Sequence, residues 1–158
     1  MITKKVNRYY CEYCTKSNCS AGAMSKHEKH CTKNPDRKCG MCDVMEEDQQ
    51  SISDMLALFP PIDTIKGTYE NDGYSNSEDW IYTDNLQIAI KNLRDLVNNC
   101  PACILAAIRQ AGIPVPLISD FDYKKEVDEI WDKMREQDAQ NEYDSMLMEE
   151  ARDYGGVK

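Results

Sequence analysis

The chain reads Cys11-Glu12-Tyr13-Cys14 near its start and, after twelve further residues, His27-Glu28-Lys29-His30-Cys31. Two cysteines at this spacing can hold one face of a tetrahedral metal ion from a tight turn. Residues 27 and 31 lie one helical turn apart and can hold the other face. The spacing therefore predicts a zinc site whose ligands are Cys11, Cys14, His27 and Cys31. His30 competes with Cys31 for the last position, but Cys31 has the better helical reach and the better donor atom.

This run resembles the two-cysteine two-histidine zinc-finger family, in the variant whose last ligand is a cysteine, over roughly residues 9–31. Tyr9 and Met24 stand where the family often has an aromatic residue and a core leucine, whereas Asn18 occupies the place of its core phenylalanine. The resemblance implies a small ββα finger. Cys19 matches no ligand position of the family and is expected to be a small packed or free thiol.

In that family, base edges of DNA are read from helix positions that fall here on Ser20, Ala23 and Lys26. The side chain of Ala23 can neither donate nor accept a hydrogen bond, and one finger buries little surface. The resemblance therefore implies weak contact with phosphates rather than sequence-specific reading of DNA.

Two further cysteine pairs are Cys39-Gly40-Met41-Cys42 and Cys100-Pro101-Ala102-Cys103. Together they predict a second, four-cysteine zinc site, similar to the paired knuckles of a zinc ribbon, with residues 43–99 as a helical insertion. A redox-active pair at residues 100 and 103 is an alternative, because a helix start lowers thiol pKa values. A second alternative is that the thiols of these two pairs are inert and bind no metal.

The composition favours metal-stabilised folding. The chain has 158 residues, a mean hydropathy of −0.68 and 41% hydrophobic residues, of which eight are Cys and eight are Met. Such a thin core usually needs a covalent or metal link. No apolar run approaches the ~20 residues that span a membrane, and the N-terminus lacks the pattern of a secretory signal. We expect a cytoplasmic protein, in which cysteines bind metal rather than form disulfides.

The charge is divided along the chain. Residues 1–42 carry nine Lys/Arg and three acidic residues, which gives +6 and leaves −15 for the rest of a chain whose net charge is −9. A basic head is consistent with weak contact to nucleic acid, and a merely solvated surface is equally consistent. The candidate phosphate contacts are Lys26, Lys29, Lys33, Arg37 and Lys38.

Apolar spacing and capping residues predict four helices: a short one within residues 43–59, one from Thr83 or Asp84 to about residue 98, one from Pro101 to about residue 112, and one over about 122–153. Residues 62–82 are predicted to be loop or turns. The expected fold is mainly α with a small ββα finger, a zinc-linked α+β arrangement. Its predicted parts are a finger at 1–38, a helical body at 39–118 closed by the four-cysteine site, and an acidic helix at 119–158.

The ligand-bearing runs look like small zinc-finger proteins of bacteriophages and prophages, which implies zinc and, for a phage protein, the host cytoplasm. No phosphate loop or nucleophile motif is apparent, and both predicted sites have four protein ligands, so we expect no enzyme and no small-molecule substrate. The first hypothesis is a zinc-binding interaction module that touches nucleic acid. The alternatives are a protein–protein adaptor for a host or phage protein and a thiol redox protein.

Overall fold

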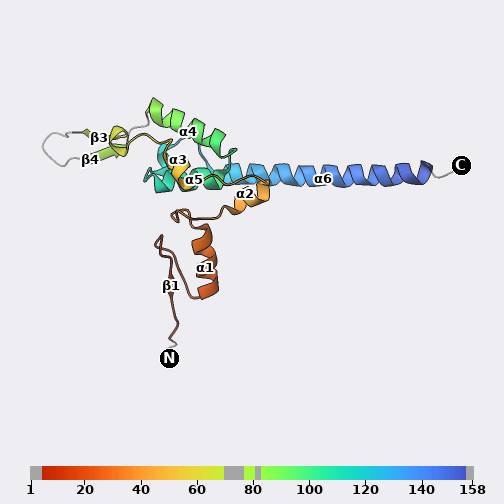
Figure 1. The fold of residues 1–158 in the computed structure, drawn as a ribbon, viewed down its shortest axis with the longest axis horizontal. Coiled ribbons are helices and arrows are strands. Elements are labelled where there is room, and N and C mark those ends of the chain that lie inside the picture. The colour runs from red at the N-terminus through yellow and green to blue at the C-terminus, as the bar shows by residue number, and fades with distance from the viewer. Residues whose placement is uncertain (1–4, 70–76, 81–82, 156–158) are drawn as a thin grey trace. The chain divides into compact units, whose positions relative to one another are not determined.

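The computed structural model describes residues 5–69, 77–80 and 83–155. The chain is mainly helical, with two small two-stranded antiparallel sheets among the described residues. Its contacts divide it into two compact units, Met1–Phe121 and Asp122–Lys158. Figure 1 shows the helices and strands along the chain.

The first unit begins with strands β1 (Tyr9–Tyr10) and β2 (Ser17–Asn18), followed by helix α1 (Ala21–His30). Tyr9 pairs with Asn18 across the two strands. The turn between the strands is closed by the amide of Cys11, which donates to the carbonyl of Lys16 over 2.9 Å. Ser20 caps α1 because its side chain accepts a hydrogen bond from the amide of Ala23.

The rest of the first unit is a helical body. Its elements are α2 (Gly40–Met45), α3 (Ile52–Leu56), the 3₁₀ turn η1 (Ile62–Thr64), β3 (Lys66–Tyr69), β4 (Ser77–Trp80), α4 (Asp84–Leu96), α5 (Pro101–Gln110) and η2 (Val115–Leu117). Thr83 caps α4 through the amide of Leu86, and Pro101 occupies the first turn of α5, as predicted.

Two details of the body differ from the prediction. Residues 62–82 are not all loop, because Lys66–Tyr69 pairs with Ser77–Trp80 in an antiparallel ladder. The predicted helix within residues 43–59 is confined to α3, and an additional helix, α2, starts directly after Cys39. The chain leaves α2 through Glu46, whose φ of 57° is left-handed.

The described residues of the first unit form two separate apolar cores. The larger core lies in the helical body, and its largest fully buried side chains include Met55, Ile65, Leu86, Ile90, Leu93, Ile104, Ile108 and Ile118. The smaller core lies between the N-terminal hairpin and α1 and contains Cys11, Met24 and Cys31, with Cys14 packed against it. Met24 is therefore the one member of this small core that is not a predicted metal ligand.

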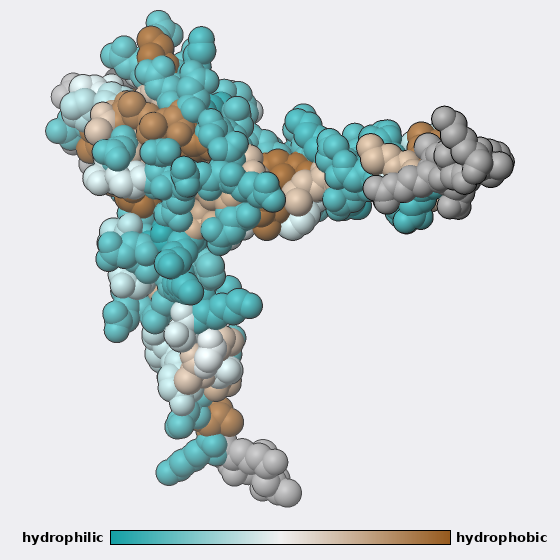
Figure 2. Space-filling view, turned by 45° about the vertical axis from the view of Figure 1, so that its right-hand side comes forward, coloured by the Kyte–Doolittle hydropathy of each residue, from teal (hydrophilic) through white to brown (hydrophobic). Residues whose placement is uncertain are grey.

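The second unit is the helix α6 (Tyr123–Gly155). Asp122 precedes it and accepts a hydrogen bond from the amide of Lys125. Lys125 pairs with Glu129 on its surface. Hydrophobic and hydrophilic residues alternate along this helix in Figure 2. Among the residues of α6 whose side chains the structure describes, the large exposed apolar ones are Tyr123, Trp131, Tyr143, Met146, Leu147 and Met148. None of the described helices is long and apolar enough to cross a membrane.

Candidate metal centres

The structure brings together the eight predicted ligands in two groups of four. Cluster 1 consists of Cys11, Cys14, His27 and Cys31, and cluster 2 consists of Cys39, Cys42, Cys100 and Cys103. Within each cluster, the candidate ligand atoms all lie within 4.8 Å of one another. All eight cysteines of the chain are free thiols.

Cluster 1 is built by the hairpin and by the end of α1. The turn after β1 carries Cys11 and Cys14, while His27 lies in the last turn of α1 and Cys31 is the residue that ends it. The Cys14 Sγ and His27 Nε2 atoms are 3.3 Å apart. Two backbone amides point at the sulfurs: Tyr13 N donates to Cys11 Sγ and Lys16 N donates to Cys14 Sγ, each over 3.4 Å.

His30 lies outside cluster 1. Its side chain is exposed, and its Nδ1 donates to the carbonyl of Lys38 over 2.9 Å. The sulfur of Cys31 instead joins the other three donors, and Cys31 is 3% exposed. Cys19 is exposed and belongs to neither cluster. The structure therefore supports Cys31 rather than His30 as the fourth donor.

Cluster 2 is built by two helix starts. Cys39 precedes the first residue of α2 and Cys100 precedes the first residue of α5, so each pair wraps one helical turn. The Sγ–Sγ distances are 3.6 Å from Cys39 to Cys100, 3.6 Å from Cys42 to Cys100 and 3.5 Å from Cys42 to Cys103. The four side chains are 0–2% exposed and belong to the core of the body.

These distances suit a tetrahedral metal ion. A disulfide needs its sulfurs about 2.0 Å apart, which is far shorter than the separations in cluster 2. Four sulfurs bound at about 2.3 Å to a tetrahedral ion lie about 3.8 Å from each other, close to the observed 3.5–3.6 Å. Replacing one sulfur by a nitrogen at about 2.0 Å shortens that edge to about 3.5 Å. Both clusters can therefore hold a metal ion.

The pKa values of the cluster 2 thiols also favour a bound cation. Hydrogen bonds from Cys100 and Cys103 hold the pKa of Cys39 far below its usual value. Burial raises the pKa of Cys42, and the hydrogen bond with Cys103 raises that of Cys100. The thiolate of Cys39 is thus stabilised, whereas Cys42 and Cys100 are held in their protonated forms. A bound cation removes this conflict because it stabilises all four thiolates together.

Cluster 1 is the more open site, and its sulfurs titrate differently. The hydrogen bond from the amide of Lys16 lowers the pKa of Cys14 to about 7. Burial raises the pKa of Cys31 above its usual value. Cys14 thus loses its proton before Cys31 does, and Cys31 must be deprotonated against its burial when a metal ion binds.

We expect metal binding at cluster 1 to weaken as the pH falls through 7. Cys14 is a thiolate above a pKa of about 7 and gains a proton below it, and protonated thiols do not bind metal. For each proton that zinc binding must displace, the affinity of cluster 1 for zinc should fall by up to about tenfold per pH unit. Dialysis at several pH values against a fixed low zinc concentration, followed by elemental analysis, measures this loss. A zinc content that stays constant down to about pH 5 would contradict the expectation.

Four of the five predicted phosphate contacts lie on the surface, but Arg37 does not. Lys26, Lys29, Lys33 and Lys38 are exposed. Arg37 is 5% exposed, and its Nη1 lies 3.7 Å from the Sγ of Cys103. The prediction that Arg37 contacts phosphate is therefore wrong, because its guanidinium faces the thiols of cluster 2.

Sequence reasoning also missed the polar side chains that connect the two clusters. Gln49 accepts a hydrogen bond from the amide of Cys39 over 2.6 Å and donates to the carbonyl of Arg37 over 2.7 Å. Gln110 of α5 donates to the carbonyls of Thr32 and Asn34. These contacts attach the segment between the clusters to the helical body. Neither Gln49, one of two adjacent glutamines in a polar stretch, nor Gln110, at the end of an apolar helix, carries a sequence signal for such a role.

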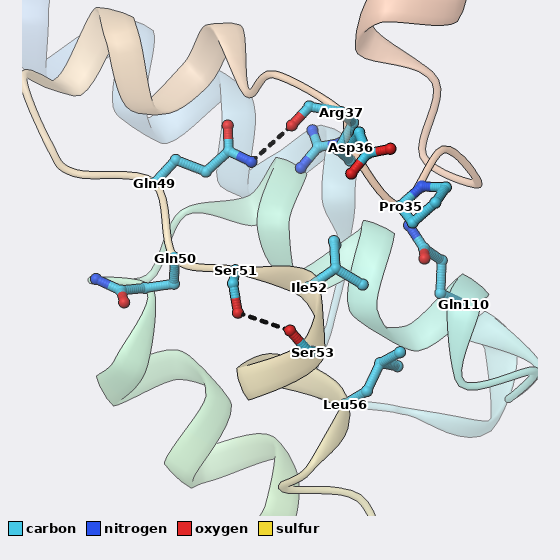
Figure 3. Close-up of a pocket in the computed structure, with 10 residues that line it drawn as sticks. All are labelled: Pro35, Asp36, Arg37, Gln49, Gln50, Ser51, Ile52, Ser53, Leu56 and Gln110. Atoms are coloured by element: carbon cyan, nitrogen blue, oxygen red, sulfur yellow. Dashed lines mark hydrogen bonds between the residues drawn. The ribbon is translucent and has the colours of Figure 1, made fainter.

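An open groove of about 590 Å³ adjoins this connecting segment. Figure 3 shows Arg37 and Gln49 on one side of it and Ile52 and Leu56 on the other. Ser51 and Ser53, which also line the groove, are hydrogen bonded to each other over 3.0 Å. The groove is therefore lined by both polar and apolar residues, and most of its polar groups already bond to the protein.

Comparison of the chain with protein-family models, with curated proteins and with solved structures finds no match in any of the three.

Proposed function

We propose that this chain is a non-catalytic zinc-binding protein that carries two structural zinc ions and acts as an interaction module. The observation that supports this most strongly is the pair of four-donor clusters, each with its donor atoms within 4.8 Å of one another. A set of three thiols and one imidazole and a set of four thiols are both common ligand sets of structural zinc. Soft sulfur donors in tetrahedral arrangement also favour zinc over magnesium or calcium.

Cluster 1 and its surroundings form, in this proposal, a zinc finger of the two-cysteine two-histidine family with a terminal cysteine. The short pair β1–β2 followed by α1, with the donors on the turn and on the helix end, supports this assignment. The likeness to small phage and prophage proteins stays part of the proposal, as does a place in the cytoplasm, where thiols remain reduced and can bind zinc.

The proposal gives the zinc ions no reaction to catalyse. A catalytic zinc keeps one coordination position for water or substrate, whereas each cluster here supplies four protein donors. The same argument disfavours the redox alternative at Cys100 and Cys103. Both side chains are 0% exposed, so a substrate disulfide has no direct access to either sulfur.

Nucleic acid is the proposed partner of the basic head. Lys26 and Lys29 are exposed on α1, and Lys33 and Lys38 are exposed on the segment that follows it. Ala23 offers no hydrogen bond to a base edge, so the contacts are to phosphates and carry little sequence information.

We expect binding to a duplex DNA of mixed sequence to be weak and to fall steeply with salt. Each phosphate contact contributes about 0.9 to the slope of log affinity against log salt concentration. Replacing both Lys26 and Lys33 by alanine should lower this slope by about two and weaken binding to every sequence equally. Fluorescence anisotropy at several salt concentrations measures both effects.

The matched control is the double replacement of Lys124 and Lys125 by alanine, which removes two exposed lysines from α6 instead. It should leave the slope unchanged. Equal effects of the two double variants, or no binding by zinc-loaded protein, would refute nucleic acid as the partner while leaving the zinc proposal intact.

A protein–protein adaptor is the second candidate, and the surface of α6 favours it. Trp131 is 40% exposed, and Met146 and Met148 are 59% and 67% exposed on the same long helix. Large exposed apolar side chains on one element are typical of protein-binding surfaces. An apolar interface of this kind would bind with little dependence on salt, which separates it from phosphate contact.

A further inference from the structure

Arg37 is a buried cation whose observed side-chain contact is with sulfur. It lies two residues before Cys39 and is 5% exposed. Its Nη1 is 3.7 Å from Cys103 Sγ. Its Nε is buried without a hydrogen-bond partner, and no ion pair joins Arg37 to a carboxylate within the described part of the chain. Burying a guanidinium without an anion is costly, so this position needs a negative partner.

Cluster 2 supplies such a partner once a metal is bound. Four thiolates around a divalent ion leave two negative charges uncompensated, and the four side chains are almost completely shielded from water. A guanidinium in contact with one of the sulfurs offsets part of this excess through a charge-assisted hydrogen bond. Gln49 donates to the carbonyl of Arg37 (Figure 3) and accepts from the amide of Cys39, and these two hydrogen bonds hold the backbone from which the Arg37 side chain reaches the cluster.

Cluster 1 has no comparable cation among the observed contacts of its sulfurs. Among the described residues, the groups that hydrogen bond to its sulfurs are the neutral backbone amides of Tyr13 and Lys16 and the side chain of His27. It also carries one thiolate fewer, because His27 replaces a cysteine. The two clusters therefore differ in exposure and in charge compensation.

We infer that Arg37 is the counter-ion of the metal centre at cluster 2, and that its guanidinium keeps the bound zinc from exchanging and the thiolates from reacting. This inference rests on the proposed zinc occupancy of cluster 2. It assigns Arg37 as a positioning residue that acts on the sulfurs and is not itself a ligand. Cluster 2 is then the permanent, inert centre of the protein, and cluster 1 is the one that exchanges zinc.

The test compares zinc-loaded full-length protein with Arg37→Lys, Arg37→Gln and Arg37→Met. A chromophoric chelator reports the rate of zinc release, and peptide mass spectrometry after brief iodoacetamide treatment reports which cysteines have reacted. We expect Arg37→Met and Arg37→Gln to release the cluster 2 zinc and to expose Cys103 to alkylation about tenfold faster or more, the scale of one charge-assisted hydrogen bond. Arg37→Lys should recover part of the protection, and alkylation of Cys11 should not change.

Lys91→Met is the matched control, because Lys91 is an exposed cation on α4 outside both clusters. Equal rates in Arg37→Met and Lys91→Met would overturn the inference. It would also be overturned if Arg37→Lys and Arg37→Gln released zinc equally fast, since a counter-ion must act through its charge. The comparison of Arg37→Lys with Arg37→Gln tests the counter-ion role even if Arg37→Met does not fold. Wild-type protein that binds no zinc would instead refute the proposed function.

Discussion

Replacing Cys100 with serine should remove one of two zinc ions per chain and unfold most of the helical body. The sulfur of Cys100 lies 3.6 Å from those of Cys39 and Cys42, and its side chain is 0% exposed. A serine hydroxyl is a poor zinc ligand and would be left buried without a suitable partner. Structural zinc contributes roughly 10–16 kcal/mol in small zinc domains, which equals or exceeds the total stability of about 5–15 kcal/mol of an ordinary domain.

Elemental analysis of protein purified without chelators measures the zinc content, and circular dichroism during heating measures the loss of helix. Cys39→Ser should behave like Cys100→Ser, because both belong to the same cluster. Cys19→Ser is the control, since Cys19 is exposed and outside both clusters. One zinc ion per chain in the wild type, left unchanged in Cys39→Ser and Cys100→Ser, would mean that cluster 2 does not hold zinc, and it would revive the redox interpretation of Cys100 and Cys103.

Replacing His27 with alanine should unfold residues 9–31 and leave the helical body intact. The small core of this segment consists of Cys11, Met24 and Cys31, so almost everything that holds it together is a ligand. The larger core shares no residue with it. Without its zinc, the segment keeps only Met24 as a buried apolar side chain, which cannot offset the chain entropy of about 20 residues.

Hydrogen exchange locates this unfolding. The amide of Cys11, which donates to Lys16 O over 2.9 Å, should lose its protection together with the amides of α1. Amides of α4 and α5 should keep theirs. His30→Ala is the matched control, because His30 is exposed and bonds only to the carbonyl of Lys38 among its described side-chain contacts. Zinc loss in His30→Ala but not in His27→Ala would show that the ligand assignment is wrong.

The cysteine pairs and the four donors of cluster 1 were accessible from the sequence because metal ligands obey local spacing rules, whereas the joining of the two pairs of cluster 2, 61 residues apart, was predicted only from their matching CxxC pattern. Cys11 and Cys14 must be close by chain geometry, and His27 and Cys31 are placed by one helical turn. Helix starts at Thr83 and Pro101 were predictable for the same reason, since capping depends on residues next to each other. Local chemistry thus predicted where donors and helix ends lie.

The features that could not be predicted depend on contacts between distant parts of the chain. Arg37 looks like the basic residues around it, and its burial follows only from the meeting of Cys39 with Cys100 and Cys103. The ladder of β3 with β4 joins Lys66–Tyr69 to Ser77–Trp80, and neither strand has the alternation of apolar and polar residues that marks a half-buried strand. Pairing of this kind is set by tertiary structure rather than by propensity.

Cluster 2 joins two cysteine pairs whose members Cys39 and Cys100 are 61 residues apart, and this separation determines the order of events during synthesis. The donors of cluster 1 are all present once Cys31 has left the ribosome. Cluster 2 must wait for Cys103, 72 residues later in the chain. At about 5–20 residues per second, this gap lasts roughly 4–14 s. From the synthesis of Cys42 until that of Cys103, Cys39 and Cys42 are only half of their cluster, so newly made protein depends on reducing conditions to keep these thiols free.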